Sequence, residues 1–227
     1  MDELRAWLAA LAEPEYAAFM GKLLPGVSGI LGVRMGHLRK MARQLARSNW
    51  QALEARWNHA CYEEAMLHGL VLALAPMDFA RHAALLSDFA GGIHNWAVCD
   101  SVAASCKFAA RDPETAFSWA SGLASGPGEF SARFGLVVML DHLLASREWA
   151  RRCLEQARAC PPGRYYTDMA RAWLAAEACL RYPQAAQPLL AGPGWDPFTR
   201  RAAALKIRQS LRCTPALAEW TRSPDFA

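Results

Sequence analysis

Apolar side chains recur at intervals of three and four residues along almost the whole chain, whereas alternating β-branched runs and Asn-Gly hairpin turns are nearly absent. The first segment shows the pattern in Leu4, Trp7, Leu8 and Leu11. This spacing places apolar residues on one face of an α-helix. Prolines and glycines mark the expected helix ends, at Pro25-Gly26, Pro76, Gly91-Gly92, Gly126-Pro127-Gly128 and Pro161-Pro162-Gly163. The pattern predicts an all-α fold of about ten or more short helices.

The predicted helices of the second half are the most regular. They span residues 129–145, 147–159, 164–181 and about 197–213, and Asp112-Pro113 supplies an N-cap followed by proline at the first helical position. Antiparallel helix pairs stacked side by side form a solenoid, an architecture that suits this many short helices. No strict sequence period is visible, so the repeats of such a solenoid would be degenerate.

Residues 93–107 are predicted to form one helix with two different sides. The apolar side would carry Val98, Val102 and Cys106. Another side would carry Trp96, Asp100, Ala103 and Lys107. Trp96 and Asp100, four residues apart, are then surface neighbours, and an aromatic ring beside an acid away from the core indicates a site. The alternative is a core tryptophan beside a solvated or ion-paired aspartate, because these residue types usually lie in those places.

Composition sets the class of protein. Apolar residues make up 53% of the 227 and charged residues 20%, which indicates a globular chain and excludes a disordered one. No apolar run reaches the roughly 18 residues that span a membrane. The N-terminus, Met1-Asp2-Glu3-Leu4-Arg5, lacks the basic and apolar regions of a signal peptide, so we expect a cytoplasmic protein.

The cysteines and histidines do not form a recognisable site. The seven cysteines form no Cys-x-x-Cys pair, and their odd number and helical positions favour free thiols over disulfides or zinc ligands. The six histidines include no His-Glu-x-x-His motif. We expect neither a metal nor a cofactor.

Charge is unevenly distributed along the chain. Residues 1–49 carry a net charge of +3, residues 50–146 carry −5, and residues 147–227 carry +6, with Lys206 as the one lysine among the basic residues of the last segment. The planar guanidinium of arginine suits phosphate, so this polarity favours a polyanion partner. A solvated surface that is simply rich in arginine is the alternative.

Six segments together resemble the bacterial AlkD-type DNA alkylation repair family, and they follow the order of that family over most of the chain. They are Gly32-Val33-Arg34 with Leu38-Arg39, residues 62–69, residues 95–101, Arg133-Phe134-Gly135 with Val138, residues 165–174, and residues 206–212. The resemblance implies a right-handed superhelical solenoid of HEAT-like antiparallel helix pairs, an α-α superhelix. It also implies a single domain over residues 1–227 that is monomeric.

The resemblance implies an activity as well. Characterised members excise N3- and N7-alkylated purines from duplex DNA without flipping the damaged base, using a Trp, an Asp four residues on, an Arg from a later helix and a second Trp. The matching catalytic residues here are Trp96, Asp100, Arg133 and Trp173. Asn95 and Ala97 stand where that branch is richer in aromatic and acidic residues.

These residue types suit the chemistry. A cationic alkylpurine is already a good leaving group, so the site must stabilise positive charge growing on the deoxyribose. The carboxylate of Asp100 would do this and would position the attacking water. The tryptophan faces attract cations, and basic groups hold phosphates. The expected DNA-binding residues are Arg34, Arg39, Lys40, Arg43, Lys206, Arg208 and Arg212.

Structural roles remain open for the same residues. Trp173 shares a face with Met169, Ala170 and Leu180, which also suits a core position. Arg133 is one turn from Glu129 and Lys107 is two turns from Asp100, so either basic group would serve as an ion-pair partner. Arg34 would be a surface charge if Gly32-Val33-Arg34 is only a loop that sets the direction of a helix.

Two other functions compete with the glycosylase. A non-catalytic DNA-binding solenoid for distorted or branched DNA would use the same basic residues without releasing a base. A protein-interaction scaffold is a common role of helical repeats, and the arginine-rich C-terminal third argues against it.

Overall fold

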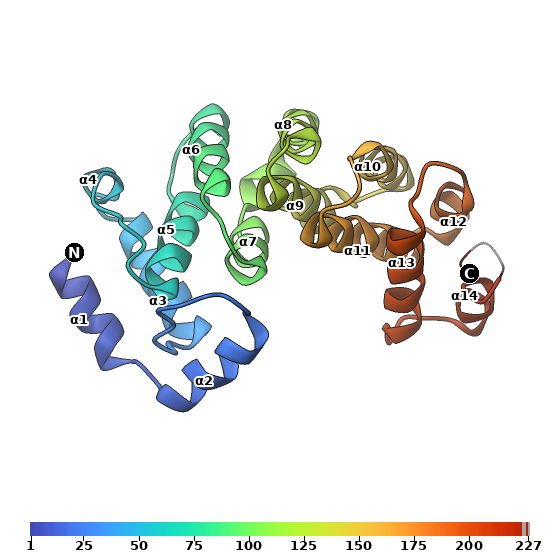
Figure 1. The fold of residues 1–227 in the computed structure, drawn as a ribbon. Helices are drawn as coiled ribbons and strands as arrows, with labels where there is room; N and C mark the ends of the chain where they lie inside the picture. The colour runs from blue at the N-terminus through green and yellow to red at the C-terminus, as the bar shows by residue number, and fades with distance from the viewer. Residues whose placement is uncertain (224–225, 227) are drawn as a thin grey trace. The chain divides into compact units, whose positions relative to one another are not determined.

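A computed structural model describes residues 1–223 and 226, and this part of the chain contains only helices, turns and loops (Figure 1). The all-α prediction is confirmed. In chain order the elements are α1 (Asp2–Ala10), α2 (Pro14–Leu23), α3 (Met35–Ala46), α4 (Gln51–Glu54), α5 (Tyr62–Leu74), α6 (Phe79–Gly91), α7 (Trp96–Ala103), the 3-10 helix η1 (Lys107–Arg111), α8 (Pro113–Ser125), α9 (Glu129–Val138), the π-helical turn η2 (Met139–Leu143), α10 (Arg147–Ala159), α11 (Tyr165–Arg181), α12 (Pro183–Ala191), α13 (Pro197–Gln209) and α14 (Pro215–Trp220).

Local sequence explains where many helices begin. Six helices start after a residue whose side chain accepts a backbone N–H of the first turn, namely Asp78, Asn95, Asp112, Ser146, Asp196 and Thr214. Such caps satisfy a donor that has no partner within the helix. Five helices have proline in the first turn, where its missing N–H costs nothing: α2, α8, α12, α13 and α14. The predicted cap at Asp112-Pro113 is confirmed.

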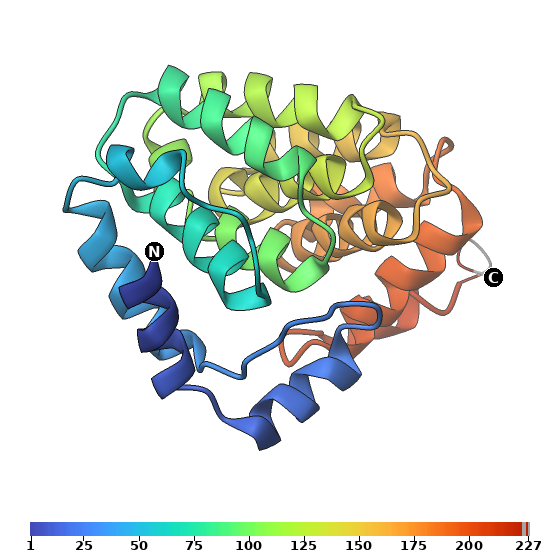
Figure 2. The same ribbon diagram turned by 60° about the vertical axis from the view of Figure 1, so that its left-hand side comes forward.

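The helices fall into two compact units, residues 1–106 and residues 107–227. In the first unit α3, α5 and α7 pack in a row, and α6 packs against α5. The second unit has two rows, α9–α11–α13 and α8–α10–α12 (Figure 2). The two rows meet where α8 packs on α9 and where α10 packs on α11. Each row buries its apolar stripe against its neighbours, as Leu67 does in α5 and Phe134 in α9, both fully buried. The single domain expected over residues 1–227 stays a prediction.

Three helices end earlier than predicted. The helix expected over residues 93–107 ends at Ala103, because the N–H groups of Ser105 and Cys106 bond to carbonyls three residues back and tighten the chain into a turn. This turn leaves Cys106 fully buried. The helix expected over 129–145 becomes a π-helical turn after Val138. The helix expected up to residue 213 ends at Gln209.

Among the described residues, no helix is long and apolar enough to cross a membrane. All seven cysteines are free, and five of them are buried. Burial raises the pKa of the Cys153 and Cys179 thiols to about 12, so these groups behave as small apolar side chains.

The loop before α3 is held by a buried carboxylate. Glu63 of α5 accepts the N–H groups of Leu31, Gly32 and Val33 at 3.0, 2.8 and 3.2 Å. Glu63 is only 1% exposed, and the bonds from Gly32 and Val33 are buried. The Gly32-Val33-Arg34 segment and the segment at residues 62–69 are therefore held together by Glu63. This contact sets the direction in which α3 leaves the loop.

Gly32→Ala should destabilise the first unit by about 2–3 kcal/mol. Gly32 has φ +87°, and an added Cβ would overlap the carbonyl oxygen of Glu13 and lie 2.7 Å from the backbone nitrogen of Ala17. Backbone atoms cannot move aside cheaply. Gly36→Ala is the matched control, since a Cβ there meets nothing within 4 Å and α3 gains a better helix former. Urea unfolding would measure both, and equal stability of the two variants would contradict the packing argument.

Candidate functional site

Helix α7 is positioned by its cap and by close packing on α5. The Asn95 side-chain oxygen accepts the Val98 N–H at 2.9 Å and starts the helix. On α5, Gly69 allows the close approach, because a Cβ there would lie 2.5 Å from a methyl of Val102 and 2.6 Å from the ring of Phe89. Val98, Val102 and Cys106 are buried, so the predicted apolar side is confirmed.

Trp96 is the first residue of α7 and is half-buried. Its indole Nε1–H donates to the carbonyl oxygen of Leu23, the last residue of α2, at 3.2 Å. This bond fixes the plane of the ring and satisfies a terminal carbonyl of α2. The ring is thus neither a core side chain nor a freely moving surface group.

Asp100 lies one turn after Trp96 on α7 and is also half-buried. The two side chains are therefore neighbours on the helix surface, as the spacing predicted. The composition of the rest of that side was predicted wrongly. Ala103 is fully buried, and Lys107 belongs to η1 and not to α7, because the helix ends before it.

Arg133 and Trp173 lie in the second unit, on α9 and α11. Arg133 is only 7% exposed, and its Nη1 donates to the carbonyl oxygen of Tyr166 at 2.8 Å. Glu129, the residue weighed as its partner, accepts the Tyr166 N–H at 2.7 Å. Both side chains thus bind the backbone at the start of α11. Trp173 is half-buried, so part of the indole reaches the surface.

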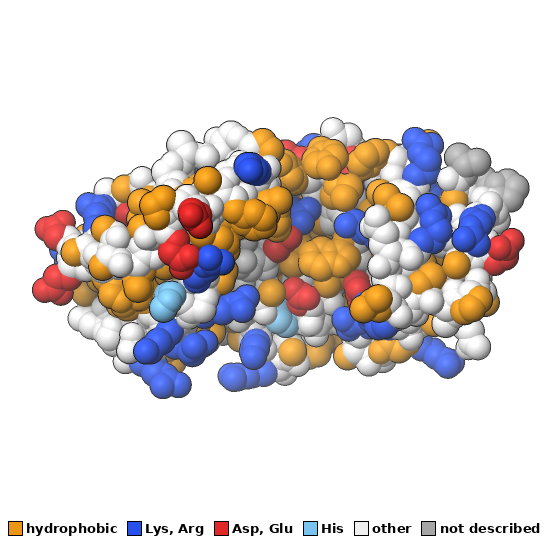
Figure 3. Space-filling model, turned by 90° about the horizontal axis from the view of Figure 1, so that it is seen from below, with side chains coloured by type: hydrophobic (Ala, Val, Ile, Leu, Met, Phe, Trp, Pro, Cys, Tyr) orange, Lys and Arg blue, Asp and Glu red, His pale blue; other side chains and the backbone are white. Residues whose placement is uncertain are grey.

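The basic residues of α3 form an exposed cationic face. Leu38, Ala42 and Ala46 are buried, and the cations project elsewhere on the helix. Arg39, Lys40 and Arg43 of α3 are exposed, as is Arg47 directly after the helix. Within the described part of the chain these four side chains have no ion pair or hydrogen bond. Lysine and arginine side chains gather at the lower left of the space-filling view (Figure 3).

The remaining predicted DNA-binding residues differ, because Arg34, Arg208 and Arg212 already bind groups of their own unit. Arg34 forms a two-pronged pair with Glu13, with its Nη2 at 2.7 Å, and lies 4.0 Å from the Tyr16 ring centre. The hydrogen bond from Arg34 lowers the pKa of Glu13. The other positions are Lys206, half-buried on α13, Arg208, which donates to the Thr221 carbonyl at 3.1 Å, and Arg212, which pairs with Glu177 at 2.6 Å.

A buried ionic cluster in the second unit was missed from the sequence. Arg171 is fully buried, and its Nη1 donates to Asp168 at 2.8 Å and Asp196 at 2.6 Å. Its Nε donates to the Ala157 carbonyl at 2.8 Å. The cluster thereby ties α10, α11 and the start of α13 together. The only local signal was the Asp168/Arg171 spacing of three residues, which is common on exposed helices.

The described residues include no group of three or more His, Cys, Asp or Glu side chains placed to hold a metal ion.

A family model for the DNA alkylation repair enzymes matches residues 4–159, more than half of the chain. The chain belongs to this family. Searches of curated proteins and of solved structures return no match.

Membership of the DNA alkylation repair family implies a role in DNA repair. The matched residues include Trp96, Asp100, Arg133 and the basic face of α3. Trp173, Lys206, Arg208 and Arg212 lie beyond the matched part. The family resemblance drawn from the sequence motifs is thereby confirmed, and the roles of the individual residues stay predictions.

Proposed function

We propose that this protein is a DNA glycosylase that releases cationic N3- and N7-alkylated purines from duplex DNA without flipping the base. The family match carries the proposal, because it covers α7 and the basic face of α3. The adjacent, half-buried Trp96 and Asp100 support it, since they supply the aromatic face and the carboxylate that this reaction needs.

In this proposal Asp100 stabilises the positive charge that develops on the deoxyribose as the glycosidic bond breaks. The electrons of that bond leave with the alkylpurine and neutralise its charge. Asp100 positions the water that adds to the sugar, and this water loses one proton to solvent. The faces of Trp96 and Trp173 would cradle the cationic nucleotide. Arg133 would contribute by holding the start of α11 as well as by its charge.

We also propose that the helix rows belong to a right-handed HEAT-like solenoid. The row α3–α5–α7 in the first unit, and the paired rows α9–α11–α13 and α8–α10–α12 in the second, support this architecture, because each helix packs on the next-but-one helix of the chain. Stacked repeats of this kind form extended surfaces that suit long partners such as DNA.

The test is release of free base from methylated duplex DNA. The purified protein should release 3-methyladenine or 7-methylguanine, and an unmethylated duplex should yield no base. Salt-dependent binding to the same duplex without base release would instead support a non-catalytic DNA-binding protein. No binding to duplex DNA at low salt would contradict both the glycosylase and the non-catalytic DNA-binding protein.

The triple variant Arg39→Ala/Lys40→Ala/Arg43→Ala should weaken DNA binding and flatten its salt dependence. The slope of log K against log salt is negative, and each lost phosphate contact lowers its magnitude by about 0.9. Losing three contacts would lower the magnitude by about 2–3. Electrophoretic or fluorescence titration at several salt concentrations measures the slope.

The matched control for α3 is Arg151→Ala/Arg152→Ala/Arg222→Ala, which removes the same charge from residues already paired with Glu148, Glu114 and Glu219. If both triple variants change the slope equally, the effect comes from net charge and the α3 face is not the binding surface.

A further inference from the structure

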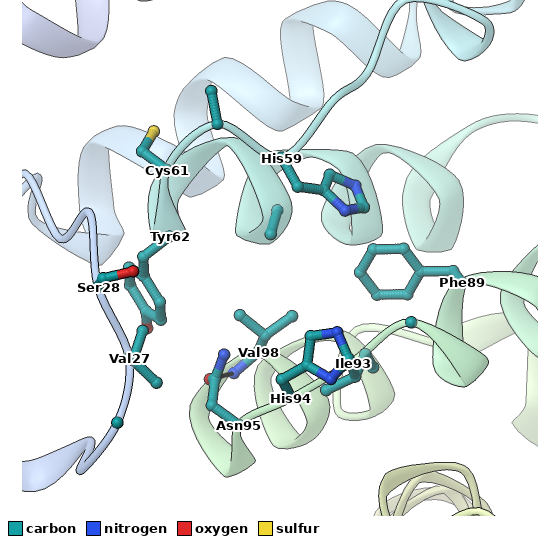
Figure 4. A pocket seen from close by; sticks show the side chains of 14 residues that line it. Val27, Ser28, His59, Cys61, Tyr62, Phe89, Ile93, His94, Asn95 and Val98 are labelled. Carbon is teal, nitrogen blue, oxygen red and sulfur yellow. Dashed lines mark hydrogen bonds between the residues drawn. The ribbon is translucent and has the colours of Figure 1, made fainter.

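The first unit contains a cavity of about 260 Å³, away from the exposed face of α3. It is lined by the loop at residues 26–28, by residues 59–62 with Ala65, by Phe89 with residues 92–95, and by Val98 (Figure 4). The lining contains no Asp, Glu, Lys or Arg side chain. A cavity without charged walls favours a neutral ligand, and this volume is slightly below the range of drug-sized sites, so it suits one or two fused rings.

A chain of hydrogen bonds leads from this cavity to a carboxylate. Nε2 of His59 lies 2.8 Å from Nδ1 of His68, and Nε2 of His68 lies 3.1 Å from Glu54. The rings are held by aromatic contacts: Trp57 stacks on His68 at 5.1 Å, and Phe89 meets His59 and His68 edge-on at 6.0 and 5.1 Å.

The chain of bonds sets which nitrogen of His59 carries the proton. Burial raises the pKa of Glu54 from 4.5. In its ionised form the carboxylate only accepts, and His68 then donates to it through Nε2–H. Burial lowers the pKa of His68 to about 3, so it is neutral and its Nδ1 must accept. Burial also lowers the pKa of His59, which then donates through Nε2 and keeps an unprotonated Nδ1. His59 thus offers a fixed acceptor.

The surroundings of His59 direct this acceptor at the cavity. The side chains of His59, His94 and Phe89 turn toward one another across the hollow, and one ring nitrogen of His59 points into it (Figure 4). His59 has φ +52° and is the one described non-glycine residue with positive φ. Such a conformation is costly and is concentrated at sites where a side chain must be aimed.

We propose that this cavity is a binding site for a small neutral heteroaromatic ring, whose N–H group donates to Nδ1 of His59. The ring would pack against Phe89 and the aliphatic side chains of Ile93 and Val98, which line the same hollow. The site is separate from the proposed catalytic pair, since neither Trp96 nor Asp100 lines it. It does not depend on the glycosylase activity.

Indole and 1-methylindole test the proposal as a matched pair, because the methyl group removes the only N–H donor. Calorimetric titration of the full-length protein at pH 7.5, without DNA, should show indole binding at least tenfold more tightly than 1-methylindole. Equal affinity for the two, or no binding of either, would overturn the proposal.

His59→Gly removes the acceptor and suits the positive φ, so it should lower indole affinity at least tenfold while the fold is kept. His37→Ala, an exposed histidine of α3 outside the cavity, is the control and should bind as the wild type does. Nitrogen-15 NMR of the wild-type histidines gives an independent test, since finding the proton on Nδ1 of His59 would also overturn the proposal.

Indole affinity should fall in acid, because a proton on Nδ1 turns the acceptor into a donor. The groups that act on His59 are Glu54, Glu64 and His94, with burial as the largest influence, and Asp88 acts on His68. Since burial lowers the pKa of His59 from 6.5, the midpoint of the loss of affinity should lie below pH 6.5. A midpoint at or above pH 6.5 would contradict this arrangement.

Discussion

Asp100→Asn should lower the rate of base release about a thousandfold and leave DNA binding nearly unchanged. Asparagine has the same shape and keeps hydrogen-bonding capacity, but it removes the charge that, in the proposed mechanism, faces the developing sugar cation. Two unit charges about 4 Å apart interact by about 4 kcal/mol at an effective dielectric near 20, which corresponds to roughly three powers of ten in rate. Single-turnover release of 7-methylguanine measures the rate, and titration with the same duplex measures binding.

Glu15→Gln is the matched control for Asp100, because it makes the same change of charge at an exposed position of α2. It should release base at the wild-type rate. Full activity in Asp100→Asn would show that the carboxylate does not stabilise the transition state. A parallel loss of activity and DNA binding would assign Asp100 to binding or to the fold of α7.

Arg171→Met should destabilise the protein by about 3–5 kcal/mol, because it leaves Asp168 and Asp196 without their buried partner. Methionine fills similar space, so most of the loss is electrostatic. Burial raises the pKa of Asp196, but hydrogen bonds from Thr199 and Arg171 outweigh it and the net pKa is lowered. A lowered pKa stabilises the fold above the unfolded value of 3.8, so the difference between wild type and variant should shrink below about pH 4.

Arg151→Met is the control for Arg171. Arg151 pairs with Glu148 at 2.8 Å and Glu155 at 2.7 Å on the surface of α10, where solvent screens both pairs. Its loss should change the unfolding midpoint far less. Equal losses in the two variants would show that burial does not decide the importance of these ion pairs.

Patterns within a few turns of chain were the predictable part of this fold. The helices predicted at residues 147–159 and 164–181 agree with α10 and α11 to within one residue. The apolar side of α7 was also correct. The extent of α7 was not, because Cys106 has the helical spacing of Val98 and Val102, and only the packed structure shows that it reaches the core through a turn.

Contacts between distant segments were not predictable from the same patterns. Glu63 binds Gly32 from 31 residues away, and Arg171 binds Asp196 from 25 residues away. Nothing in the local sequence of Glu63 distinguishes a buried clamp from a solvated helix carboxylate. For the candidate site, spacing predicted that Trp96 and Asp100 are neighbours, but it contained no sign that the indole N–H binds Leu23.

The Arg171 cluster also determines where the polypeptide can be shortened. The family match ends at residue 159, but Arg171 reaches back to the carbonyl of Ala157 and forward to Asp196. A chain cut at the end of the match would keep α9 and α10 and lose α11, against which both helices pack. Their apolar faces would then meet water and favour aggregation. The end of the recognisable family sequence is therefore not a usable truncation point. A stable fragment that contains the family-matching part should also include α11 and α13.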